Sequence, residues 1–209
     1  RYESEIAFAA SQTGGLKDFP VMLRISAANP SGFDYADCAA DGTDLAFALV
    51  PDGTWLDYEV ETWNPDGESV VWLKVPSLSS STRVRMYWGL KDGEKPGAYA
   101  GQTIWSAAGF STVLHMNDYS GRDATGDSAF GISAGVSLQD GKVGKCLKTA
   151  STTDRMIVKY AEGVPWATAL VSPSFTLSFW VNVVERGTDW PYFLQWSREG
   201  NANGTGLWI

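Results

Sequence analysis

The stretch from Asp44 to Gly89 constrains the fold most, because short apolar runs alternate there with tight-turn sequences. The turn sequences are PDG at 51–53, NPDG at 64–67 and a serine-rich loop, and the runs between them are rich in Val, Leu, Tyr and Trp. Gly and Asn supply the positive φ angles that tight hairpins require. The pattern predicts an antiparallel meander of strands.

Side-chain alternation in this stretch predicts which residues face the core. Residues 56–62 place Leu, Tyr, Val and Thr on one side of a strand, and Asp57, Glu59 and Glu61 on the other. Period two with a charged outer side is typical of a sheet with one face in water. We therefore expect both glutamates in solvent, with Arg83 and Arg85 as cross-strand partners. The inward set of the last strand is Val84, Met86 and Trp88, and the less regular run at 69–75 indicates an inner strand covered on both faces.

Strand patterns recur along the rest of the chain, and no segment makes a convincing helix. The further strand candidates are 3–10, 19–26, 141–149, 155–160, 174–184, 192–197 and 204–209. The fold class predicted for these 209 residues is all-β, with two antiparallel β-sandwich (jelly-roll-like) modules at 1–89 and 103–209 and a linker at 90–102. A strand ending at Ile209 has an unprotected edge, so we expect the native polypeptide to continue or another chain to supply the missing strands.

Composition excludes some partners. A net charge of −8 argues against a nucleic-acid groove or an anionic membrane surface, and no apolar run is long enough to span a bilayer. Abundant Gly, Ser, Thr, Asp and aromatic residues favour a turn-rich extracellular β protein. Cys38 and Cys146 are predicted to be two small buried thiols, because a disulfide would need their Cα atoms within about 7 Å.

Three motifs in the first module occur in close order, namely YE-x-E-x-WNP from Tyr58, VW-x-KVP-x-LS from Val71 and MYWG ending at Gly89. With them, the stretch from Phe33 to Gly89 resembles an uncharacterised bacterial and archaeal domain. That domain occurs in secreted and envelope proteins, including some near biopolymer-transport proton channels. The resemblance implies an extracytoplasmic location.

The second module carries VLHMND at 113–118, a Ser-Gly turn, GKVGKCLKT at 141–149 and SFTLSFWVN at 174–182. In this order they resemble the first part of a concanavalin A-like lectin or laminin-G-type jelly roll. The resemblance implies binding of carbohydrate or protein ligands, often beside calcium. It also makes Asp118 and Asp123 candidate ligands of a calcium ion. The aspartates at 34, 37, 41 and 44 are explained by solvated turns, with calcium as the alternative.

The sequence contains no catalytic constellation. His115 is the only histidine, which removes zinc sites built on several histidines, and a packed or hydrogen-bonded structural role is predicted for it. Glu59 and Glu61 share a face at a separation somewhat above that of a retaining glycosidase pair. The E-x-D-x-x-E arrangement of laminarinase-like hydrolases is absent, so we predict no enzyme activity.

Sugar binding requires less, because apolar sugar faces stack on exposed aromatic rings while polar groups hold the hydroxyls. Trp63 falls on the polar side of its strand and Trp180 on a Ser/Thr side. The candidate ligand-binding residues are Trp63, Tyr87, Trp180, Trp190, Tyr192 and Trp196. The predicted function is a non-catalytic module that binds a glycan or a protein surface. The alternatives are a structural spacer whose tryptophans are all buried, and a fragment of a glycoside hydrolase.

Overall fold

The computed structural model describes residues 1–9, 15–91, 93–94, 101–126, 130–151, 153–158, 174–184, 192–196 and 205–208. The chain divides into two compact units, Arg1–Phe175 and Thr176–Ile209. Strands dominate the described residues, which confirms the all-β prediction. The prediction of no helix was wrong, because a short α-helix, α1, spans Gly101–Ala107.

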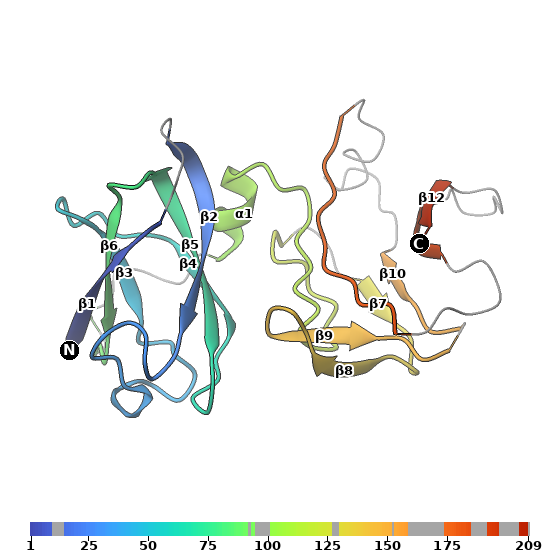
Figure 1. The fold of residues 1–209 in the computed structure, drawn as a ribbon, viewed down its shortest axis with the longest axis horizontal. Coiled ribbons are helices and arrows are strands. Elements are labelled where there is room, and N and C mark those ends of the chain that lie inside the picture. Colours follow the sequence, from blue (N-terminus) through green and yellow to red (C-terminus); the bar gives the residue numbers. More distant parts are fainter. Residues whose placement is uncertain are drawn as a thin grey trace. The chain divides into compact units, whose positions relative to one another are not determined.

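Two three-stranded antiparallel sheets face each other in the first unit (Figure 1). In one sheet the order is β1-β6-β3, and in the other it is β2-β5-β4. Their bounds are β1 Tyr2–Ala7, β6 Arg83–Trp88 and β3 Ala46–Val50, then β2 Leu16–Ile25, β5 Ser69–Leu78 and β4 Tyr58–Thr62. A short 3-10 helix, Tyr35–Asp37, lies in the connection between β2 and β3.

The meander predicted for 44–89 was wrong, although its strands and turns are present. After β3 the chain makes a single bridge between Ala48 and Trp55 and then crosses to the facing sheet. Of the strand pairs in this stretch, β4–β5 is a hairpin of consecutive strands, and β3 pairs with β6. One four-stranded sheet would leave an apolar face in water, whereas two facing layers bury the apolar side of every strand.

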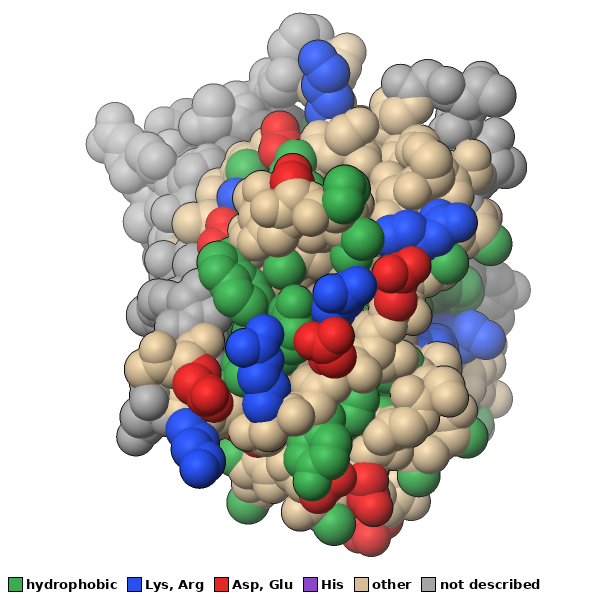
Figure 2. All heavy atoms as spheres, turned by 90° about the vertical axis from the view of Figure 1, so that its left-hand side faces the viewer, with side chains coloured by type: hydrophobic (Ala, Val, Ile, Leu, Met, Phe, Trp, Pro, Cys, Tyr) green, Lys and Arg blue, Asp and Glu red, His purple; other side chains and the backbone are tan. Residues whose placement is uncertain are grey.

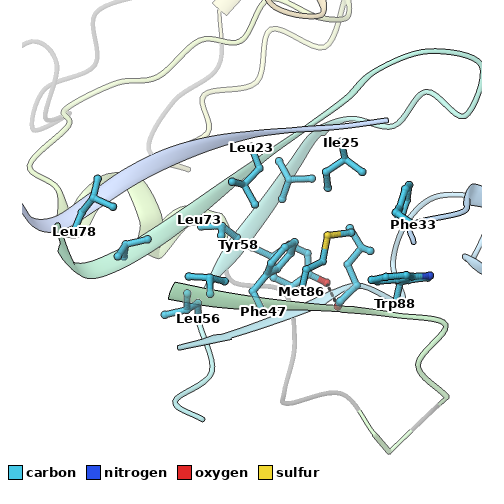
Figure 3. Close-up of a cluster of buried hydrophobic side chains, with 14 residues drawn as sticks. Leu23, Ile25, Phe33, Phe47, Leu56, Tyr58, Leu73, Leu78, Met86 and Trp88 are labelled. Atoms are coloured by element: carbon cyan, nitrogen blue, oxygen red, sulfur yellow. Dashed lines mark hydrogen bonds between the residues drawn. The ribbon is translucent and has the colours of Figure 1, made fainter. Parts of the chain in front are cut away.

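The core lies between the two sheets, as Figure 3 shows. The inward set predicted for β6 is confirmed, since Val84, Met86 and Trp88 are 0%, 0% and 1% exposed. Tyr58 reaches across this core and donates its hydroxyl hydrogen to the carbonyl oxygen of Leu45 at 2.8 Å. The strand β5 lies in the centre of its sheet and is covered on both faces, as its irregular alternation predicted.

The outer side of sheet β1-β6-β3 carries mixed charges. Figure 2 views the molecule from this side and shows acidic and basic side chains interspersed with hydrophobic ones. Arg85 lies 3.7 Å from Glu3 and 3.6 Å from Glu5. The pairing of Arg85 with Glu59 and Glu61 expected from the sequence was wrong, because β6 and β4 belong to different sheets.

Smaller strand pairs follow in both units. In the first, β7 (Phe130–Ile132) pairs with β10 (Met156–Val158), and β8 (Ser137–Asp140) pairs with β9 (Lys145–Lys148). In the second, β11 (Tyr192–Trp196) pairs with β12 (Thr205–Trp208). The strand predicted at 174–184 was wrong, since these residues join no sheet in the described part of the chain and Phe175, Leu177 and Phe179 are 42–46% exposed.

Cys38 and Cys146 are free thiols. Both are half-buried rather than fully buried as predicted. Burial, with Asp44 nearby, raises the pKa of Cys38 to about 12.

None of the helices in the described part of the chain is long and apolar enough to cross a membrane.

Gly42 and Gly53 provide a matched test of the packing around Trp63. Both have positive φ, +68° and +74°, but an added Cβ would lie 2.6 Å from the Trp63 ring at Gly42 and within 4 Å of nothing at Gly53. Either change to alanine costs about 1–2 kcal/mol of backbone strain. We expect Gly42→Ala to cost about 1–3 kcal/mol more, because the indole must move. Equal losses in urea denaturation would show that Trp63 is not held in place.

Candidate functional site

The outer face of β4 is not in water, contrary to the sequence prediction. Glu59 is 5% exposed, and the side chain of Glu61 is 3% exposed. The helix α1 packs over β2, β4 and β5, and its Ile104 and Trp105 form a second apolar cluster with Ala124 against Trp72 of β5. Alternation correctly placed both glutamates on the outer side of β4, but helix α1 and its apolar cluster cover that side.

A β-bulge in β4 sets the positions of the acidic side chains. Val60 pairs with Val71 and Thr62 with Val70, so that Glu61 is an extra residue in the ladder. A bulge interrupts the alternation of side chains and redirects them. Glu59 and Glu61 share the outer face, as alternation predicted, and after the bulge Trp63 turns back to the core side, where it packs against Phe33 and Tyr35. The outward placement predicted for Trp63 was wrong for this reason.

Each buried glutamate accepts a hydrogen bond from an indole. The Nε1–H of Trp105 donates to Oε2 of Glu59 at 2.6 Å, and the Nε1–H of Trp72 donates to Oε2 of Glu61 at 2.5 Å. Hydrogen bonds to ionised acceptors are short and about twice as strong as neutral ones. A buried carboxylate requires such partners, because removal from water is otherwise very costly.

His115 lies between the two carboxylates. Its Nε2 is 3.3 Å from Oε2 of Glu59, and its Nδ1 is 3.3 Å from Oε2 of Glu61. Only the doubly protonated imidazolium has a hydrogen on both nitrogens, so the geometry suits the charged ring. Burial alone lowers the pKa of His115, but the hydrogen bond to Glu59 and the charges of both carboxylates outweigh burial and the opposing charge of Arg122, so the pKa is raised. The predicted hydrogen-bonded histidine is confirmed.

The segment that carries His115 is anchored at both ends. Asp123 is fully buried and accepts hydrogen bonds from the backbone N–H of Val113 and Thr125 at 2.9 and 3.0 Å, and from Thr112 Oγ1. Burial raises the pKa of Asp123, and these hydrogen bonds outweigh it, so that the pKa is lowered. Asn117 donates to the Glu61 carbonyl oxygen at 2.7 Å. The sequence prediction that made Asp123 a calcium ligand stays untested, but its described bonds hold the segment together.

Metal ligation finds little support in the geometry. Asp118 uses Oδ1 to accept from the backbone N–H and hydroxyl of Ser120, a local turn separate from the bonds of Asp123. The two nitrogens of His115 face different carboxylates, so these groups do not converge on one point. Within the described ranges, no group of three or more His, Cys, Asp or Glu side chains is arranged to hold an ion.

A polar pocket of about 200 Å³ opens beside the two glutamates and His115. Among the described residues, Oε1 of Glu59 and Oε1 of Glu61 have no hydrogen-bond partner. Met116 holds a positive φ of 57°, an uncommon conformation for a side chain of this size. The pocket is lined by Glu59, Val60, Glu61, His115, Met116, Asn117, Asp118, Ser120, Gly121, Arg122 and Ala124.

Of the aromatic candidates from the sequence, Trp63, Tyr87 and Trp180 do not line this pocket. Tyr87 is 9% exposed and lies against Trp55 and the guanidinium of Arg1. Trp180 is 75% exposed in the second unit. Trp190 lies outside the described residues, and Tyr192 and Trp196 belong to β11, where the structure describes the backbone alone.

The sequence analysis did not predict that Glu59, Glu61 and His115 form one buried cluster. It also did not predict the residues that contact this cluster or line its pocket, namely Trp72, Trp105, Asn117 and Arg122. One indication was present in the sequence, since Trp72 carries an indole N–H within a largely apolar inner strand. A buried indole usually finds an acceptor, and the neighbouring strand carries two carboxylates.

The comparisons with known proteins name no relative for this fold and site. No family model matches the chain, and no match was found among the curated proteins or the solved structures.

The single histidine allows its environment to be measured directly. We expect an NMR titration of the His115 ring to give a midpoint above the ordinary value of about 6.5. Glu61→Gln should lower that midpoint, and Glu68→Gln, at an exposed ion pair, should not. A raised folded-state pKa stabilises the fold fully below about pH 6.5, and this contribution is lost as the pH rises through the folded value. A wild-type midpoint at or below 6.5 would contradict the charged-ring geometry.

Replacing Trp105 by Phe removes the indole donor together with part of a buried ring. We expect Trp105→Phe to lower the free energy of unfolding by at least about 1.5–3 kcal/mol, because it removes a hydrogen bond to a buried charge and leaves a cavity. Trp55→Phe is the control, since that ring is 41% exposed, and it should cost less than about 0.5 kcal/mol. Similar losses for the two variants in urea denaturation would rule out a special role for the buried indole.

Proposed function

We propose that this chain is a non-catalytic binding module that takes a sugar residue of a glycan in the pocket beside Glu59 and Glu61. The observation that carries the proposal is the pair of buried carboxylates at this pocket, each with one oxygen lacking a hydrogen-bond partner in the described structure. A few well-placed polar groups in a concave site are what fix the orientation of a small ligand.

The lining favours a ligand that both donates and accepts hydrogen bonds. Carboxylates accept only, while Arg122 donates only, and Asn117 and Ser120 carry groups of both kinds. Sugar hydroxyls both donate and accept, so one sugar residue can satisfy every type of group around the pocket. The pocket is polar, and neither Trp63 nor Trp180 lines it, so hydrogen bonds rather than stacking on these rings would supply the specificity.

The position of His115 supports a non-catalytic role over the hydrolase alternative. A glycoside hydrolase holds the scissile bond between two carboxyl groups. Here the imidazole lies between Glu59 and Glu61, at 3.3 Å from each, and occupies the space that a substrate would need.

The wider class of the protein is part of the same proposal. The two facing sheets of the first unit support a β-sandwich, and we propose that the second module begins a jelly roll of the concanavalin A-like or laminin-G type. The resemblance of 33–89 to an envelope-associated domain supports a secreted or cell-envelope location. A protein surface as the ligand, and a purely structural spacer, are the competing outcomes.

A glycan array probed with the 209-residue chain, with and without calcium, tests the proposal. We expect binding, and we expect Glu61→Gln to weaken it about 10- to 100-fold, since hydrogen bonds to a charged group contribute about 1.5–3 kcal/mol. Glu68→Gln and Trp180→Ala should leave it unchanged, because neither residue lines the pocket.

Each contrary outcome has a separate meaning. Silence across the array would overturn glycan binding in favour of a spacer or a protein-binding role. Binding that Trp180→Ala abolishes would move the site to the second unit. Release of reducing sugar that Glu59→Gln or Glu61→Gln abolishes would establish a hydrolase.

A further inference from the structure

We propose that the pocket selects a sugar that bears a free ammonium group, an amino sugar, over its neutral counterparts. This inference rests on the proposed function and specifies the class of ligand for the same pocket. The carboxylates of Glu59 and Glu61, both more than nine-tenths buried, line the pocket and carry the unpartnered Oε1 atoms.

The buried carboxylate oxygens of the site accept hydrogen bonds and donate none. An ionised carboxylate accepts and cannot donate, so the ligand must supply the hydrogens. An ammonium group has three N–H donors and no acceptor, which makes it the most complete partner for two carboxylate oxygens. A hydroxyl can donate only one hydrogen, and its bond to a carboxylate lacks the second charge.

The charges around the pocket point the same way. Glu59, Glu61 and Asp118 carry three negative charges, against two positive charges on Arg122 and the imidazolium of His115, which leaves a net charge of −1. An N-acetylated or neutral sugar would leave this charge without compensation. Burial strengthens the preference, because charges interact more strongly away from water.

The arrangement separates the two cations that line the pocket from the oxygens that a ligand would reach. Both His115 nitrogens contact the Oε2 atoms, which also accept from the indoles of Trp72 and Trp105. Arg122 is exposed, and within the described residues its guanidinium forms no ion pair with either glutamate. An incoming ammonium group therefore meets Oε1 atoms that no other described cation occupies.

Binding of a cation should also displace charge from His115. The charged groups that act on the ring are Glu59 and Glu61 from β4 and Arg122 from the 121–126 segment. The described ring contacts from β5 and α1 are the uncharged indoles of Trp72 and Trp105, and Lys74 of β5 is paired with Asp57. A ligand ammonium adds a further positive charge near the same carboxylates. By linkage, the ligand favours the neutral imidazole, so binding releases a proton from the site.

Three probes of one ring shape test the proposal on the 209-residue chain, namely the methyl glycosides of glucosamine, N-acetylglucosamine and glucose. By calorimetry near pH 6.5, at low salt, we expect glucosamine to bind about tenfold or more tightly than the other two. NMR of the single histidine should show the ring shifting toward its neutral form on addition of glucosamine and not of glucose.

The variants locate the preference. Glu59→Gln should reduce the preference for glucosamine to about threefold or less while glucose still binds, and Glu68→Gln should leave the preference intact. If Glu59→Gln fails to fold, Asp118→Asn on the exposed rim should still reduce the preference, by about twofold. Retention of the full preference in both pocket variants would overturn the assignment to these carboxylates.

The outcomes also distinguish a failure of the amino-sugar preference from a failure of glycan binding itself. Equal binding of the three glycosides would overturn the amino-sugar preference and leave glycan binding standing. Binding of none of them, together with a silent glycan array, would overturn both. Tight glucosamine binding without any response of His115 would overturn the proton-linked part.

Discussion

A pair of buried carboxylates on one strand is the constraint on which the rest of the first unit depends. Carboxylates out of water must be paired and hydrogen-bonded, or they destabilise the fold by several kcal/mol. Glu59 and Glu61 meet this requirement with one imidazole and two indoles, which come from three different parts of the chain. The burial of the outer face of β4 therefore depends on helix α1 and on the His115 segment.

The bulge at Glu61 ties this outer layer to the core. It inserts Glu61 as an extra residue on the outer face beside Glu59, and it returns Trp63 to the aromatic cluster with Phe33 and Tyr35. Bulges occur often next to functional sites because they redirect side chains without breaking the sheet. Here one irregularity serves the polar site and the apolar core together.

Local structure was well predicted where local chemistry decides it. The six strands of the two facing sheets were identified from their apolar runs, and the inward side chains of β6 and the two-sided burial of β5 were correct, whereas β7 and β8 were not predicted. The pairing of strands was not, because Pro51-Asp52-Gly53 forms a turn in either a meander or a crossover. The choice between them depends on whether both apolar faces find a partner layer, which no single strand pattern encodes.

The site shows the same division. From the residues alone, the position of Glu59 and Glu61 on one side of β4, the absence of a second histidine and the need of each indole for an acceptor could all be established. Whether that side meets water or a second layer depends on α1 and on His115, which are more than 40 residues away in sequence. The sequence determined the all-β character, the faces and the available chemistry, because these follow from neighbouring residues. The tertiary structure alone decided that the charged face is buried, because burial depends on what distant segments cover.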